Sequence, residues 1–165
     1  MKRLAIVLAT AGAAIGVLAI LSASGSAQAP GTTTLQLFER ERGSSFGFVD
    51  NPPKIKNRRN ARVSVGDVFA FSSPVFDQSR ATRLGTLGVQ CTVTKPGTEA
   101  RSESLCVGAF QLKDGTITLT APLKGEPRTV TVAVTGGTGA YAGARGTLQT
   151  TNVRGGAEDV ITLLP

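Results

Sequence analysis

The chain has 165 residues, and its 18 basic and 11 acidic residues give a formal net charge of +7. It contains no His, which excludes a Ser-His-Asp triad, a Cys-His dyad and the zinc sites that depend on imidazole. With one Tyr and no Trp there is no aromatic platform beside the basic residues, so we expect no nucleic acid partner. We also expect no metal and no cofactor.

The first 29 residues have the pattern of a secretory signal peptide. A basic start precedes an uncharged apolar run over residues 4–21, and small residues follow as far as Ala29. Cleavage after Ala27 is preferred, because Pro30 would lie just beyond the other candidate site. A retained anchor helix is the alternative, since the apolar run approaches the ~20 residues that span a bilayer. We therefore predict a secreted chain without stable membrane insertion after cleavage.

Residues 30–165 have the pattern of one all-β domain. Gly, Thr and Val recur with turn signals about every ten residues, and no long window has apolar positions at helical spacing. A closed, eight-stranded, antiparallel up-and-down β-barrel is favoured because it leaves no open sheet edge, and a two-sheet sandwich is the alternative. The candidate strands are residues 33–39, 46–49, 67–72, 86–94, 103–112, 116–120, 129–135, 141–151 and 159–163.

Residues 51–62 form the one long stretch without a strand pattern. Its two prolines lack the backbone N–H that a sheet hydrogen bond needs, and its clustered charged residues leave little apolar surface to bury. We predict an exposed loop there, and contact between its basic residues and a polyanion is the alternative.

The two cysteines provide a test of strand pairing. If residues 95–102 close a hairpin, Cys91 lies opposite Cys106 and Leu87 opposite Phe110, and one face of the hairpin is apolar throughout. An exported chain with an even number of cysteines normally oxidises them. We predict a disulfide between Cys91 and Cys106 on the core side, with two buried free thiols as the alternative.

The glycine-rich residues 136–146 contain Gly-x-Gly-x-x-Ala, which superficially matches a dinucleotide-binding motif. That motif needs a helix after the glycines, whereas residues 147–151 have a strand pattern. We predict a tight turn between two strands, with positive φ at one or more positions and no phosphate site.

The same stretch resembles a signature of dirigent proteins and allene oxide cyclases, two groups of one barrel superfamily: Val134-Thr-Gly-Gly-Thr-Gly-Ala-Tyr-Ala-Gly-Ala-Arg-Gly146. Glu39-Arg-Glu-Arg-Gly-Ser44 and Val65-Gly-Asp-Val-Phe-Ala-Phe71 resemble further cyclase segments. Phe48-Val-Asp-Asn-Pro-Pro53 resembles a run usual in exported bacterial proteins with this domain. The resemblance implies an eight-stranded barrel whose apolar central cavity opens at one end.

The resemblance also implies where a ligand would lie. Polar residues of the cyclase pocket are matched here by Gln36, Phe38 and Ser73, its Pro by Ser45, and its Cys is kept as Cys91. The acids of dirigent proteins are matched by Ser72, Ser73 and Ala140, while their Arg is kept as Arg145. The expected pocket residues are Gln36, Leu37, Phe38, Ser45, Phe71, Ser73, Cys91 and Phe110.

Three functions follow as expectations. The first is a secreted barrel that binds a small hydrophobic molecule and guides its cyclisation or coupling by restraining its shape. The second is an isomerase similar to allene oxide cyclase, acting without a cofactor, in which Glu39, Asp50 or Arg145 replaces the lost polar groups. The third is a non-catalytic secreted or envelope protein that presents residues 51–62 to a partner. The sequence is also compatible with assembly of this chain into a homo-oligomer.

Overall fold

The computed structural model describes residues 31–55 and 61–165. The predicted signal peptide and the middle of the basic loop lie outside the described residues. Two short 3-10 helices, η2 (Glu99–Arg101) and η3 (Gly139–Tyr141), lie among the strands. The strands are β1 (Thr33–Arg40), β2 (Ser45–Val49), β3 (Arg62–Val63), β4 (Val68–Asp77), β5 (Arg83–Lys95), β6 (Gly97–Thr98), β7 (Glu103–Leu112), β8 (Gly115–Lys124), β9 (Thr129–Gly137), β10 (Gly146–Val153) and β11 (Gly156–Leu163).

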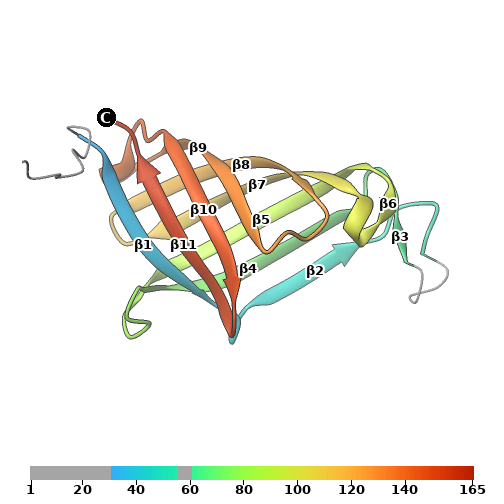
Figure 1. Ribbon diagram of the computed structural model, residues 1–165, viewed down its shortest axis with the longest axis horizontal. Coiled ribbons are helices and arrows are strands. Elements are labelled where there is room, and N and C mark those ends of the chain that lie inside the picture. The colour runs from blue at the N-terminus through green and yellow to red at the C-terminus, as the bar shows by residue number, and fades with distance from the viewer. Residues whose placement is uncertain (1–30, 56–60) are drawn as a thin grey trace, which may run out of the picture.

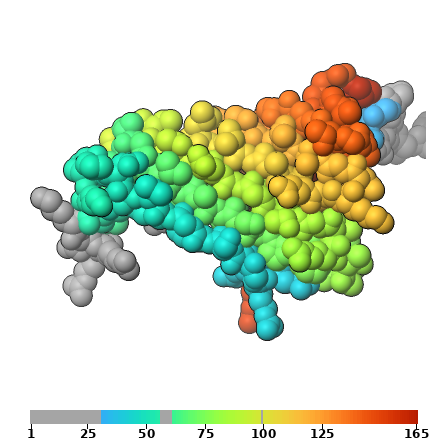
Figure 2. Space-filling model, turned by 180° about the vertical axis from the view of Figure 1, so that it is seen from behind, coloured from blue at the N-terminus to red at the C-terminus, as the bar shows by residue number. Residues whose placement is uncertain are grey.

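Eight strands close into an antiparallel barrel (Figure 1), which confirms the predicted fold. The order around the wall is β1-β11-β10-β9-β8-β7-β5-β4, and β1 then pairs with β4 to close the ring. That closing seam is short, because only Leu37, Phe38 and Glu39 have partners on β4. β2 is a ninth strand that pairs with β4 beyond the seam, and seen from behind it runs along the edge of the wall (Figure 2).

The predicted hairpin and its disulfide are confirmed. β5 and β7 place Cys91 opposite Cys106, and Leu87 opposite Phe110. Cys91 and Cys106 form a disulfide, and the described part of the chain has no free cysteine.

The glycine-rich stretch is a turn between β9 and β10, as predicted. Gly139 and Gly143 have φ of 61° and 74°, in the left-handed region that glycine tolerates. The strand expected over 141–151 begins at Gly146 instead, because η3 and the turn at Gly143 occupy its first residues. Among the described residues no helix is long and apolar enough to cross a membrane.

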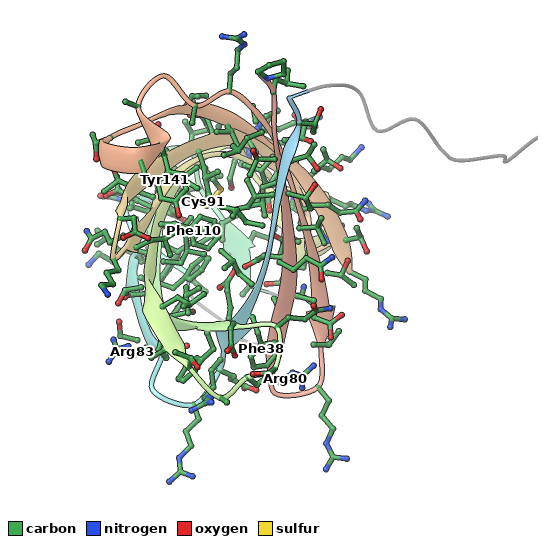
Figure 3. All side chains as sticks on the ribbon, turned by 90° about the vertical axis from the view of Figure 1, so that its left-hand side faces the viewer. Phe38, Arg80, Arg83, Cys91, Phe110 and Tyr141 are labelled. Atoms are coloured by element: carbon green, nitrogen blue, oxygen red, sulfur yellow. A yellow bond between two sulfur atoms is a disulfide. The ribbon has the colours of Figure 1, made fainter. Side chains whose placement is uncertain are left out.

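One half of the barrel interior is filled by side chains. Alternate residues of each strand face inward, and Val75, Phe110, Ile117 and Ile161 are fully buried there. Figure 3 looks into this end of the barrel, where Phe110 projects into the interior from the wall. The other half, towards β2, β3 and β6 (Figure 1), is hollow and carries the site.

Candidate functional site

Two adjoining hollows lie in the unfilled half of the barrel. The outer one is an open groove of about 870 Å³ between β2, the β3–β6 ribbon and the end of β8. The inner one is a cavity of about 140 Å³ inside the barrel. Phe69, Phe71 and Leu123 line both hollows, so the groove leads onto the cavity.

The groove has an exposed aromatic edge on β2. Phe46 and Phe48 face the same side as Phe71 and Phe69, with which they pair on β4. Their side chains are nevertheless 71% and 40% exposed, because β2 projects beyond the closed barrel. Exposed aromatic rings beside an apolar hollow form a surface suited to a hydrophobic molecule.

The inner cavity has an apolar wall with a single ionisable side chain among the described residues, that of Glu39. Leu87, Leu119 and Val132 are among the apolar side chains, and the Cys91–Cys106 disulfide forms another part of the wall. No Lys or Arg lines the cavity in the part of the chain that the structure describes. A carboxyl in such surroundings has little contact with water and no counter-charge in the cavity.

Glu39 is paired with a second buried carboxyl, that of Asp159. In the β1–β11 register Glu39 lies opposite Ala157 and Leu37 opposite Asp159, so the two acids are diagonal neighbours on the inner face. Glu39 is 8% exposed and Asp159 is 1% exposed. The strand alternation that buries Leu37 and Ile161 therefore also carries both acids inside.

Hydrogen bonds fix this carboxyl pair. Thr150 Oγ1 donates to Asp159 Oδ1 at 2.7 Å, and the Ser73 hydroxyl hydrogen-bonds Glu39. Ser44 Oγ donates to Ser73 Oγ at 3.0 Å. Asp159 Oδ2 is buried, and in the described part of the chain no backbone N–H, hydroxyl or amide group donates a hydrogen bond to it. A proton on Glu39, which hydrogen-bonds Asp159, would supply the missing donor.

The pKa values place that proton on Glu39. Burial, together with the neighbouring charge of Asp159, raises the pKa of Glu39 from 4.5 to about 9. Burial also raises the pKa of Asp159 from 3.8 to about 6, against hydrogen bonds from Thr150 and Glu39 that lower it. Near neutral pH the pair thus holds one proton on Glu39 and one negative charge on Asp159. Such an acid can act as a general acid if its one proton passes from the hydrogen bond with Asp159 to a group in the cavity.

The predicted pocket residues on β1 and β2 lie away from the cavity. Gln36 is exposed and lies on the face of β1 opposite to Leu37 and Glu39. Phe38 is buried on the outer side, where Arg80 Cζ lies 4.0 Å from its ring centroid (Figure 3). Ser45 is exposed at the start of β2.

Three of the other predicted residues come together at the site. Phe71 and Cys91 line the inner cavity, and Ser73 hydrogen-bonds Glu39. Leu37 and Phe110 belong to the packed core of the filled half.

Of the three polar candidates, only Glu39 reaches the cavity. Asp50 accepts a hydrogen bond from the Ile55 backbone N–H at 3.0 Å and so caps a turn. Arg145 donates to the Pro165 carbonyl on the exposed surface. Asp159 was not among the residues predicted from the sequence. Its inward position follows from β11, which begins at Gly156 and turns Ala157, Asp159 and Ile161 to one face. No group of three or more metal-ligating side chains occurs among the described residues.

The fold and the site define a small antiparallel β-barrel with an apolar cavity, in whose wall lies Glu39, one acid of a buried carboxyl pair. Residues 53–161 match the model of the allene oxide cyclase barrel-like domain, and the chain belongs to that family. A search of curated protein sequences returned no match.

Solved structures with a similar fold include three proteins that act on different molecules. A pyocyanin demethylase has a TM-score of 0.62 and 23% identity, over 81% of this chain and 99% of that chain. A pterocarpan synthase dirigent protein has a TM-score of 0.58 and 20% identity, over 80% and 82% of the two chains. An exo-specific intermolecular Diels-Alderase has a TM-score of 0.57 and 16% identity, over 80% and 97%. At these identities the likeness concerns the fold alone.

Proposed function

We propose that this protein binds a small hydrophobic molecule in the groove and inner cavity and promotes its cyclisation or coupling without a cofactor. The observation that carries the proposal is an apolar cavity whose single ionisable wall residue, among those described, is the buried acid Glu39. The names of two fold neighbours, a Diels-Alderase and a pterocarpan synthase dirigent protein, support the same class of chemistry.

The groove and cavity would contribute mainly by restraint. A flexible substrate held in a folded shape has its reacting ends together before reaction, which lowers the entropic part of the barrier. Glu39 would add general-acid catalysis, protonating or hydrogen-bonding an oxygen or nitrogen on which negative charge develops. Asp159 and Ser73 would orient the Glu39 carboxyl, and Asp159 would help to keep it protonated until it reacts.

We propose further that the protein acts after export. The basic start and apolar run of the first 29 residues support this, and a disulfide is typical of oxidising compartments. Protein recovered from the culture medium of its host should lack residues 1–27 by intact mass. A full-length mass in the membrane fraction would support a retained anchor instead.

Ligand binding is tested by filling the cavity. Ala121 is buried in the cavity wall on β8, whereas Ala133 is exposed on the neighbouring strand β9. We expect Ala121→Leu to weaken binding of the fluorescent reporter N-phenylnaphthylamine at least about tenfold, because the added carbons occupy much of the 140 Å³ cavity. Ala133→Leu should bind as the native protein does, and equal binding by both variants would refute the assigned site.

Catalysis is tested through product stereochemistry. Candidate polyene, epoxide and quinone methide substrates would be incubated with native protein, with Ala121→Leu and with Glu39→Gln, and the products separated on a chiral column. We expect stereochemical bias with native protein, loss of bias with Ala121→Leu, and a slower biased reaction with Glu39→Gln. Binding without any change in product would favour the non-catalytic alternative.

A further inference from the structure

We propose that the ligand is a hydrophobic molecule with a ring-sized head that carries a basic nitrogen or a positive charge, and that this head seats in the inner cavity against Glu39, which separates it from the buried Asp159. The inference rests on the proposed function and adds the chemical class of its ligand. It comes from three observations: the sizes of the two hollows, the lack of a basic side chain in the described cavity wall, and the burial of Asp159 behind Glu39 without a counter-ion.

The sizes divide the ligand into two parts. A dry cavity of roughly 150 Å³ holds one benzene-sized group, and the inner cavity has about 140 Å³. The remainder of the molecule would lie in the groove of about 870 Å³, against the exposed rings of Phe46 and Phe48. The ligand therefore has two parts. A body of one or more apolar groups lies in the groove, and a single ring-sized head passes Phe69 and Phe71 to enter the inner cavity.

The negative charge lies on Asp159, behind Glu39, and among the described residues no basic side chain lines the cavity. Arg40, next to Glu39 on β1, faces outward, and its Cζ lies 3.5 Å from the Phe76 ring centroid. Arg80 also lies outside, bridged to Glu158 on β11 at 2.9 Å. Glu41, a further acidic residue, lines a shallow hollow that reaches Glu39 from the outer surface. The described strands thus turn no basic side chain towards the pair.

The buried charge of Asp159 has the Glu39 proton and the Thr150 hydroxyl as partners, but it has no counter-ion among the described residues. Asp159 is 1% exposed, and its Oδ2 has no ordinary donor in the described residues. A buried negative charge without a counter-ion is costly, and a ligand cation that approaches it removes that cost. A ligand carboxylate would instead add a second negative charge in an environment of low polarisability. The wall therefore selects for bases and cations and against acids.

The experiment compares three probes of nearly equal shape and different charge. N-methylisoquinolinium, naphthalene and naphthoate would be titrated against the full chain by isothermal calorimetry at neutral pH, with displacement of N-phenylnaphthylamine as a second measurement. We expect the cation to bind at least about tenfold more tightly than the anion, because a unit charge a few ångströms away acts strongly in a protein interior.

Two nearly isosteric variants, Glu39→Gln and Asp159→Asn, should have opposite effects on the preference for the cation. Glu39→Gln replaces a neutral, protonated acid by a neutral amide that still donates to Asp159, so the preference for the cation should persist. Asp159→Asn removes the charge, so the affinities for cation and anion should come within about twofold of each other. Glu158→Gln removes a carboxylate from the same strand but on the outer face, and it should leave the preference unchanged.

The outcomes separate this inference from the proposed function. Binding of naphthalene with no preference for the cation over naphthoate would overturn the inference and leave the proposed function standing. Failure of all three probes to displace the reporter would overturn both. If Asp159→Asn does not fold, the native protein at about pH 5 replaces it, since Asp159 is then largely neutral. The preference for the cation should shrink there, and an undiminished preference would refute the role of Asp159.

Discussion

The buried carboxyl pair of Glu39 and Asp159 should make the protein less stable as the pH rises through neutrality. The folded state holds a proton on Glu39, whose pKa is about 9, whereas the unfolded chain releases that proton near pH 4.5. Folding therefore takes up a proton throughout this range. The stabilisation is fully present below about pH 4.5 and is lost as the pH rises towards about 9.

The magnitude follows from proton linkage. One proton taken up on folding changes the free energy of unfolding by about 1.4 kcal/mol per pH unit. The chain contains no His, so no other side chain ordinarily titrates between about pH 6.5 and about 8.5. Asp159, with a pKa of about 6, also makes the free energy of unfolding depend on pH, but mainly below that window. We expect a loss of roughly 3 kcal/mol across the two pH units.

The assay is guanidinium unfolding followed by far-ultraviolet circular dichroism, which suits an all-β chain without Trp. Glu39→Gln should abolish the slope and should be more stable than the native protein at the upper end of the window. Glu158→Gln, which removes an exposed outer carboxylate, should keep the native slope. A native slope below about 0.3 kcal/mol per pH unit, far under the one-proton value, would refute the assignment of a buried proton to Glu39.

Three further predictions concern stability. Replacing Cys91 and Cys106 together by Ala should lower the free energy of unfolding by roughly 3 kcal/mol, because the disulfide spans 15 residues, and an unchanged denaturation midpoint would contradict this. Phe110→Ala should cost about 3–5 kcal/mol by the same measurement, since Phe110 is fully buried in the filled half of the barrel, and a loss below about 1 kcal/mol would refute that packing. Arg40→Ala should cost about 1 kcal/mol through loss of the stacking on Phe76 at the closing seam. Reporter binding should be unaffected by Arg40→Ala, and weakened binding would place Arg40 at the site.

Local patterns in the sequence were sufficient for the fold and for the disulfide. Alternation of apolar and polar residues, with turn residues between the runs, is a short-range property, and it predicts the register of β5 and β7. The lack of His likewise limits the chemistry whatever the fold. Glu39 was among the candidate polar residues because the resemblance to the cyclases suggested replacements for their lost polar groups.

Which side chains meet inside the barrel was decided by the tertiary structure. Gln36 and Phe38 were expected in the pocket, but β1 turns Leu37 and Glu39 inward and leaves Gln36 outside. Asp159 lies 120 residues from Glu39 in the sequence, and the two meet only because β11 pairs with β1 in this register. A one-residue slip of β11 against β1 would move Asp159 to the outer face and separate the two acids. The sequence by itself therefore determined the barrel, and the closure of the barrel determined the carboxyl pair.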